Sequence, residues 1–210
     1  MHKTGERINR RKVYLLIDLM NSIDWKLDGG QILDVWNYYS NSIQGDIKLI
    51  EIYKNLGVIS SFEKNTLCLK KDKNHKLPKK VILDLNDNPD LAQTIAVSCF
   101  GLGLQCDLYG LQTLKIKETD RLLALEKELV KLGGNVLITN DSLHLKKSKE
   151  FNVNICIDTY EDHRMAMAFA PLGIIKPIII NDPMVVSKSF PSYWKALKKL
   201  NFRISEYKRN

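Results

Sequence analysis

One arrangement of helix and strand patterns occurs twice along this chain and begins a third time. Residues 47–69 (IKLIEIYKNLGVISSFEKNTLCL) show a helix pattern, a Leu-Gly stop, a strand, a short polar turn and a second strand. Residues 121–145 (RLLALEKELVKLGGNVLITNDSLHL) show the same series, and residues 193–205 (YWKALKKLNFRIS) begin it again in a truncated form. A repeated unit constrains the architecture more than any single motif does.

The helix of the second copy is the clearest. Its leucines recur at i, i+3, i+7 and i+10, which places them on one face of a helix. They are Leu122, Leu125, Leu129 and Leu132. Gly133 and Gly134 follow directly, and this pair predicts a left-handed cap that ends the helix.

Further strand and helix patterns lie between the repeated stretches. Residues 80–85 predict a strand before a helix over about 89–103, and residues 154–157 predict a strand before a helix over about 161–172. The apolar run 174–180 predicts a buried strand. Alternating strands and helices indicate an α/β domain, and three such units, each closing with a hairpin, predict pseudo-threefold symmetry about a common axis.

The composition bounds the class of partner. The chain has 210 residues, of which 44% are hydrophobic and 27% charged, so a disordered or fibrous protein is excluded. Its formal charge of +8 attracts anions: nucleic acid, an anionic membrane surface, or small phosphorylated or carboxylated molecules. Six lysines and one acid lie in residues 70–80, which we interpret as a solvated loop because no aromatic residues for base stacking accompany them.

The cysteines and the N-terminus indicate no metal and no membrane. The four cysteines form no C-x-x-C pair, so we expect neither a zinc site nor a disulfide framework, and we interpret them as core residues. They are Cys68, Cys99, Cys106 and Cys156. A basic start precedes a short apolar patch, residues 13–20, which contains Asp18 and lacks a cleavage site. We expect a soluble, cytoplasmic protein with free thiols.

Cations lie where helix starts are expected, although a helix N-terminus carries partial positive charge and disfavours them. Lys117 and Arg121 flank the start of the helix in the second repeat, and His163 and Arg164 open the next helix. Lys188 immediately precedes the last helix. Each group follows a strand pattern, where α/β proteins gather binding residues.

Two interpretations of these cations stay open. In one, neighbouring acids neutralise each cation locally: Glu118 and Asp120, or Glu161 and Asp162. In the other, the helix starts converge, and their N–H groups and cations form one anion site. Asp90 and Glu118 belong to the same set. Two carboxylates in one cationic pocket indicate proton transfer on an anionic substrate.

Five segments resemble successive motifs of the 3-phosphoshikimate 1-carboxyvinyltransferase (EPSP synthase) family of enolpyruvyl transferases. They are 41–46 (NSIQGD), 88–94 (NPDLAQT), 114–121 (LKIKETDR), 159–167 (TYEDHRMAM) and 187–191 (SKSFP). The resemblance covers residues 29–202, and it is to the C-terminal half of the family's chain only. It implies one domain of the family's inside-out α/β barrel fold.

The resemblance implies a reaction without metal or organic cofactor. The family adds the 5-hydroxyl of shikimate 3-phosphate to C2 of phosphoenolpyruvate and then eliminates phosphate, in the pathway to aromatic amino acids. By this resemblance, Asp90 takes the hydroxyl proton and contacts shikimate 3-phosphate, and Glu118 serves the methylene carbon as acid and base. Lys117 contacts shikimate 3-phosphate. A cationic clamp binds phosphoenolpyruvate, with His163 adjacent to it, and consists of Arg121, Arg164 and Lys188.

The resemblance also implies that half of the site is missing. The family places its active site between two similar domains, and we expect residues 1–28 to be a basic segment that matches the family poorly and residues 29–210 to be the C-terminal domain. We expect negligible turnover from this chain alone, and a separate N-terminal half as a possible partner. Two alternatives stay open: a non-catalytic anion-binding module or degraded copy, and a domain of the related UDP-N-acetylglucosamine enolpyruvyl transferases. We expect no nucleic acid and no membrane as partners.

Overall fold

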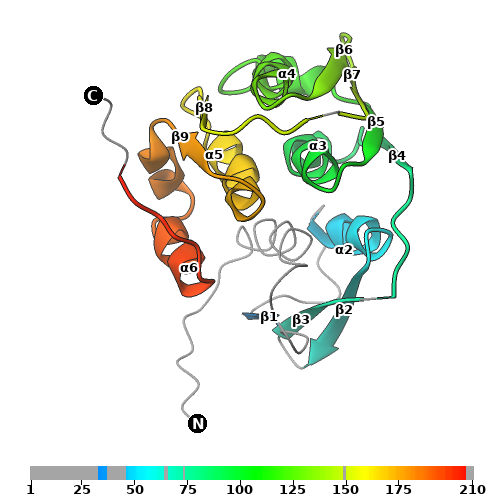
Figure 1. Cartoon of the computed structure of the whole chain (residues 1–210). Helices are drawn as coiled ribbons and strands as arrows, with labels where there is room; N and C mark the ends of the chain where they lie inside the picture. Colours follow the sequence, from blue (N-terminus) through cyan, green and yellow to red (C-terminus); the bar gives the residue numbers. More distant parts are fainter. Residues whose placement is uncertain (1–32, 37–45, 64–65, 73, 149, 207–210) are drawn as a thin grey trace. The chain divides into compact units, whose positions relative to one another are not determined.

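A computed structural model describes residues 33–36, 46–63, 66–72, 74–148 and 150–206 of the chain (Figure 1). The chain divides into two compact units, Met1–Pro78 and Lys79–Asn210. The predicted segment 1–28 lies outside the described residues.

Among its described residues, the first unit contains a helix beside a small antiparallel sheet. Strands β1 (Leu33–Trp36), β2 (Val58–Glu63) and β3 (Thr66–Lys71) pair in the order β1-β3-β2, and α2 (Asp46–Lys54) packs on β2. Gly57 adopts a φ of +84° after the helix, a left-handed conformation that suits glycine. The helix, the Leu-Gly stop and the hairpin of the first repeat are confirmed.

The second unit is built on a mixed four-stranded sheet. It consists of β4 (Lys80–Asp84), β5 (Gln105–Tyr109), β6 (Asn135–Ile138) and β7 (Ser142–Lys146), in the order β4-β5-β7-β6. Strands β4 and β5 are parallel, so a crossover must join them, and η2 (Pro89–Leu91) with α3 (Ala92–Gly101) provides it. The β6-β7 hairpin is antiparallel and closes the second repeat.

Helix α4 (Arg121–Lys131) follows a short helical turn, η3 (Gln112–Ile116). The leucine face predicted from the sequence is confirmed, because all four leucines are fully buried. Asp120 caps the helix by accepting a hydrogen bond from the Leu123 amide at 3.0 Å. Gly133 ends it with a φ of +96°, as the Gly-Gly pair predicts.

The remainder of the second unit repeats the strand-helix-strand-helix order of β4 to α4. It contains the parallel strands β8 (Ile155–Ile157) and β9 (Ile178–Ile180), with α5 (His163–Phe169) between them and α6 (Tyr193–Lys199) after them. Two further helical turns, η4 (Ala170–Ile174) and η5 (Pro183–Lys188), precede β9 and α6 respectively. In the third repeat the helix forms, but the described residues 202–206 form no strand.

The prediction of one buried strand over 174–180 is wrong in extent. Ile174 ends η4, and only residues 178–180 pair as β9, where they are half-buried. The reason lies in Pro177, which has no N–H to donate to a sheet, and in Lys176, whose amide bonds back to the Leu172 carbonyl at 3.1 Å. The chain therefore stays helical before the proline and extends only after it.

Helix α3 is buried on all sides from Ala92 to Phe100 and packs against β5, α4 and α5. Three helices thus lie side by side in the second unit (Figure 1). Cys99 and Cys106 belong to this core, as expected, whereas Cys68 and Cys156 are half-buried. Among the described residues, no helix is long and apolar enough to cross a membrane.

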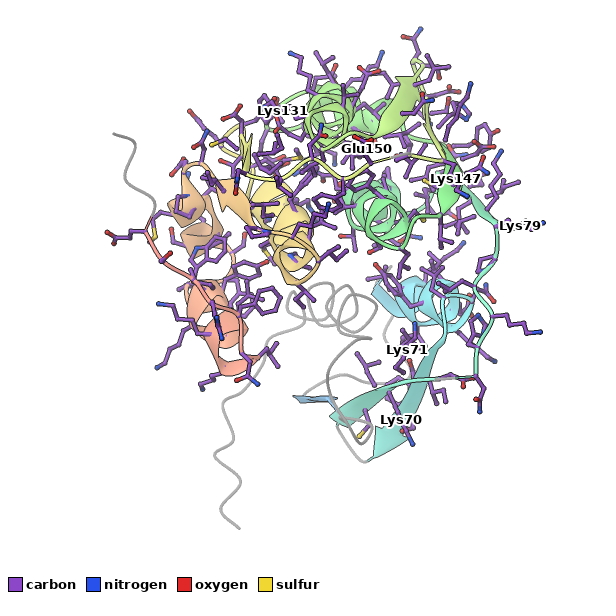
Figure 2. All side chains as sticks on the ribbon, viewed as in Figure 1. Lys70, Lys71, Lys79, Lys131, Lys147 and Glu150 are labelled. Carbon is purple, nitrogen blue, oxygen red and sulfur yellow. The ribbon has the colours of Figure 1, made fainter. Side chains whose placement is uncertain are left out.

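The sequence interpretation of residues 70–80 as a solvated loop is correct only for the middle of this lysine-rich stretch. Lys70 and Lys71 end strand β3, and Lys80 begins β4, so the loop is limited to the residues between those strands. Figure 2 shows Lys79 projecting away from the ribbon, and its side chain is exposed.

Candidate functional site

The guanidinium group of Arg121 is the centre of the site. Arg121 is only 2% exposed, and each of its nitrogens donates to a different carboxylate. Nε donates to Asp162 Oδ2 at 2.7 Å, and Nη1 donates to Asp90 Oδ1 at 3.0 Å. Nη2 donates to Glu118 Oε2 at 2.5 Å. Three acids from three places in the chain therefore meet at one planar cation.

Helix starts bring these groups together. Arg121 is the first residue of α4, and Asp162 immediately precedes α5, where its Oδ1 caps the helix by accepting the Arg164 amide at 2.9 Å. Asp90 lies in η2, the turn that leads into α3. Because α3 packs against α4 and α5, the beginnings of the three helices converge. The predicted convergence of helix starts is observed for those of Arg121 and Arg164, with Asp90 beside them.

Asp90 is bound by two more cations. Arg164 Nη2 donates to Asp90 Oδ2 at 3.1 Å, and Arg164 Nη1 donates to the Asp90 carbonyl at 3.3 Å. Lys117 Nζ lies 3.7 Å from Asp90 Oδ1. The side chains of Asp90 and Glu118 are 37% and 50% exposed, whereas Arg121 beneath them is buried. A molecule arriving from solvent meets the two carboxylates before it meets the guanidinium.

His163 lies at the edge of the cluster. Its Nδ1 is 3.8 Å from Asp162 Oδ1, and the side chain is 24% exposed. Burial lowers the pKa of His163 below its usual 6.5; Asp162 opposes this effect, and the cations Arg164 and Arg121 reinforce it. The imidazole is therefore neutral at pH 7 and can accept a proton.

Gln93 was missed by the sequence interpretation. It comes from α3, is 1% exposed, and its Nε2 donates to Asp162 Oδ2 at 3.4 Å, while its Oε1 has no partner among the described residues. Asp162 itself was considered only as a neutralising neighbour. The signal that could have identified it is its place directly before a helix, where aspartate caps the first turn.

Lys188 is not at the start of the last helix. It is the last residue of η5, and α6 begins only at Tyr193. Its side chain is exposed, and within the described residues the ion pairs of the cluster do not include it. Lys188 therefore ends a helical turn, where the dipole favours positive charge, and does not begin a helix. Packing of η5 on α5 still places it beside one element of the site.

The cluster is electrically balanced rather than cationic. Its cations Lys117, Arg121 and Arg164 face an equal number of carboxylates. The local-neutralisation interpretation is thus right for Glu118 and Asp162, but Asp120 instead caps α4 and Glu161 is exposed. Convergence and neutralisation both hold, because the acids that neutralise Arg121 come from three separate elements.

This arrangement suits proton transfer next to a bound anion. Two accessible carboxylates, Asp90 and Glu118, contact the same guanidinium through different nitrogens, so their positions relative to each other are set by one rigid group. An anion that takes one nitrogen of Arg121 comes to lie beside a proton acceptor. Such fixed charges stabilise a reacting centre without reorganising.

Comparison with known families and proteins gives consistent results. The EPSP synthase (3-phosphoshikimate 1-carboxyvinyltransferase) family matches residues 27–197. A 3-phosphoshikimate 1-carboxyvinyltransferase of Bacteroides fragilis is 43% identical over 175 residues, which cover 82% of this chain and 42% of the relative. One of Neisseria meningitidis is 34% identical over 162 residues, 77% of this chain and 37% of the relative. The chain thus spans about two fifths of the length of these curated relatives.

Solved structures share the fold. An EPSP synthase from Acinetobacter baumannii superposes with a TM-score of 0.68 at 19% identity, over 90% of this chain and 45% of that chain. The enolpyruvyl transferase NikO from Streptomyces tendae superposes with a TM-score of 0.61 at 12% identity, over 94% of this chain and 44% of that chain. At these identities the likeness concerns the α/β fold alone.

Proposed function

Because this chain belongs to the EPSP synthase family, we propose that it contributes the C-terminal half of an enolpyruvyl transfer site. The reaction moves the enolpyruvyl group of phosphoenolpyruvate to the 5-hydroxyl of shikimate 3-phosphate and releases phosphate. The observation that carries the proposal is the pair Asp90 and Glu118 bound to one buried arginine. Acid-base chemistry on an anionic substrate needs this combination.

The residues divide the first step of the reaction between them. Asp90 accepts the proton of the 5-hydroxyl, the hydroxyl oxygen bonds to C2 of phosphoenolpyruvate, and Glu118 delivers a proton to the methylene carbon. The product of this addition is a tetrahedral intermediate. Asp90 is held in place for this task, because Arg121, Arg164 and Lys117 all lie within 3.7 Å of its carboxylate.

The second step reverses the proton movement at carbon. Glu118 removes a proton from the new methyl group, the C2–O bond to phosphate breaks, and inorganic phosphate leaves with the proton that Asp90 had accepted. The charges of phosphoenolpyruvate lie against Arg121, Arg164 and Lys188, and Lys117 contacts shikimate 3-phosphate. His163, adjacent to Arg164, is neutral at pH 7 because burial lowers its pKa, so it adds no further charge to this clamp.

We propose that this half-site has negligible turnover until a complementary N-terminal domain closes it. The share of the relatives that the chain covers, 42% and 37%, supports this division. The exposure of Asp90 and Glu118 supports it too, because a site open to water forfeits the positioning that a closed cleft provides. The strand-helix order shared by β4 to α4 and β8 to α6 is in keeping with pseudo-threefold symmetry, which stays a prediction.

The experiment measures phosphate release from phosphoenolpyruvate and shikimate 3-phosphate, with the chain alone and with a separately produced N-terminal domain of a relative. We expect turnover only in the mixture, and a fall of about 10²- to 10⁴-fold in kcat for Asp90→Asn and for Glu118→Gln. Glu126→Gln, on the same helix as Arg121, is the matched control and keeps the rate. Normal turnover by the chain alone would overturn the half-site, and transfer to UDP-N-acetylglucosamine instead would identify the sister activity.

A further inference from the structure

The loop between β8 and α5 is attached to α4 at two points. Asp162 at the end of the loop binds Arg121, the first residue of α4, as described above. Tyr160, two residues earlier, donates its hydroxyl to Glu128 Oε1 at 2.6 Å. Arg121 and Glu128 are seven residues apart, which is two helical turns, so both face the same side of α4.

Glu128 is a fully buried carboxylate with a complete set of partners. It is 0% exposed, and its Oε1 also accepts Lys131 Nζ at 2.8 Å. Its Oε2 accepts the backbone amide of Asp158 at 3.2 Å. Burial of a charge is costly unless such bonds satisfy it, and here they do. Two of its partners, Asp158 and Tyr160, belong to the loop.

The loop has a backbone that needs such support. Tyr160 and Glu161 both adopt left-handed conformations, with φ of 52° and 56°, although neither is glycine. Residues with side chains are disfavoured there, and the conformation persists only where the surroundings over-determine it. Glu128 contacts Asp158 before this pair and Tyr160 within it, and Asp162, directly after the pair, contacts Arg121, so the bend is held on both sides.

A second layer of contacts fixes the start of the loop. Lys131 Nζ also binds Asp158 Oδ2 at 2.7 Å, and Asn181 Nδ2 donates to Asp158 Oδ1. The end of β8 is thereby tied both to α4 and to the residue after β9. These contacts join α4, the loop and Asn181, whereas Arg121 is the residue of α4 that binds the proposed reacting groups Asp90 and Glu118.

We propose that Glu128 is a positioning residue of the site, which acts through Tyr160 to set the places of Asp162, His163 and Arg164. The role in a reaction rests on the proposed function; the role in placing the loop does not. Helix α4 then works as a rigid spacer, with Arg121 at one end of its buried face and Glu128 at the other. Asp162 caps α5 and bridges to Arg121, so a displaced loop changes both contacts at once.

The first test uses the 210-residue chain alone and measures the titration of His163 by NMR. Tyr160→Phe removes one hydroxyl and keeps the ring, and Glu128→Gln serves as a second variant. Burial lowers the pKa of His163, and the charges that face it are Asp162 and Arg164 from its own segment and Arg121 and Glu118 from the α4 side. A loosened loop admits water, so we expect its titration midpoint to rise toward 6.5 in both variants.

The matched control is Glu126→Gln, which removes the same charge from the same helix but from a side chain outside this network. We expect it to leave the His163 midpoint unchanged. A merely structural role would lower the urea midpoint of the variants while His163 in the folded protein titrates as in the unmodified chain. That result in folded Tyr160→Phe would overturn the proposal.

The second test uses the chain complemented with an N-terminal domain. We expect Tyr160→Phe to lower kcat about tenfold with a smaller change in KM. Displacement of Arg164 and Asp162 should impair the alignment of the bound substrates for reaction more than it impairs substrate binding. An unchanged kcat together with a shifted His163 midpoint would contradict the reaction role and keep the loop role. If the unmodified mixture shows no turnover, the proposed function fails, and the His163 titration still decides whether Glu128 positions the loop.

Discussion

Arg121 shows why the shape of a buried cation matters as much as its charge. Its Nε, Nη1 and Nη2 are directed at Asp162, Asp90 and Glu118 in one plane. A lysine ammonium is a compact point charge and cannot reach three separated carboxylates. Asp162 is the acid that depends on this most, because it is fully buried and cannot turn to water instead.

Arg121→Lys is therefore expected to cost about 3 kcal/mol of unfolding free energy, the lower end for breaking a buried ion pair. The measurement is urea unfolding followed by circular dichroism. Arg203→Lys is the control, because Arg203 is exposed and outside the cluster, and its substitution is expected to change stability by less than about 0.5 kcal/mol. Equal midpoints for the two variants would show that the fork geometry contributes nothing.

His163 predicts a pH dependence whose sign follows from its environment. Its folded pKa is lowered by burial, so the unfolded chain takes up a proton at a higher pH than the folded chain does. The contribution of His163 to the free energy of unfolding is complete above about pH 6.5. It is lost as the pH falls through the lower pKa that His163 has in the folded protein. In His163→Asn the decline in urea midpoint between pH 7 and pH 5 should be shallower; a parallel decline would contradict the assignment.

Some residues of the site can be predicted from the sequence because they stand at recognisable local positions, and others cannot. Arg121, Arg164 and Asp90 stand at helix starts. Cations are unusual there, so the sequence alone indicates these positions. Gln93 and Glu128 lie within helices, and their roles depend on partners 69 and 30 residues away. Only the packing of α3 against α4 and α5 and the contacts of the loop before α5 bring these partners close, so no spacing in the sequence predicts them.

The ends of helices carry testable information at the scale of elements. Gly133 ends α4 with a φ of +96°, and an added Cβ would lie 2.6 Å from the Glu150 carbonyl oxygen. Gly103 follows α3 with a φ of +68° but has open space around it. Gly173 in η4 has open space and no left-handed backbone. The three positions separate conformational strain from steric clash.

Alanine at these glycines should therefore give graded losses. We expect Gly173→Ala to change the unfolding free energy by less than about 0.5 kcal/mol. Strain alone should cost about 1 kcal/mol in Gly103→Ala, and strain with a backbone clash about 3 kcal/mol in Gly133→Ala. Thermal unfolding of the three variants provides the comparison. If Gly103→Ala lowers the free energy of unfolding as much as Gly133→Ala does, the close approach of the Glu150 backbone does not explain the need for glycine after α4.

Elements with a strong local period were predicted well, and elements that depend on their neighbours were not. The leucine period of α4 and the paired glycines after it specify a helix and its end without any tertiary information. The apolar run 174–180 carries no such period, and a proline within it decides where the strand begins. The third repeat shows the same limit, because its apolar and polar pattern after α6 pairs with no strand among the described residues.

At the scale of the whole molecule, the charge of the chain and the charge of the site differ. The chain has 32 basic and 24 acidic side chains, an excess of +8 that draws anions from a distance. The cluster around Arg121 is balanced, since three carboxylates face three cations. Long-range attraction thus delivers an anion to a place where Glu118 already occupies one nitrogen of Arg121.

Glu118→Gln should consequently bind phosphoenolpyruvate more tightly in the chain alone, even though the same change is expected to lower kcat in the complemented enzyme. Removal of the competing charge frees Arg121 Nη2, and we expect affinity to rise about three- to tenfold by calorimetric titration. Glu126→Gln changes the net charge equally but lies away from Arg121, so its effect should stay below about twofold and vanish near 1 M salt, where the Debye length is about 3 Å. The gain in Glu118→Gln should largely persist there, because Arg121 is buried. Equal gains in the two variants, or a gain that salt removes in both, would mean that only the field of the whole molecule attracts the ligand and that Glu118 does not compete for its cation.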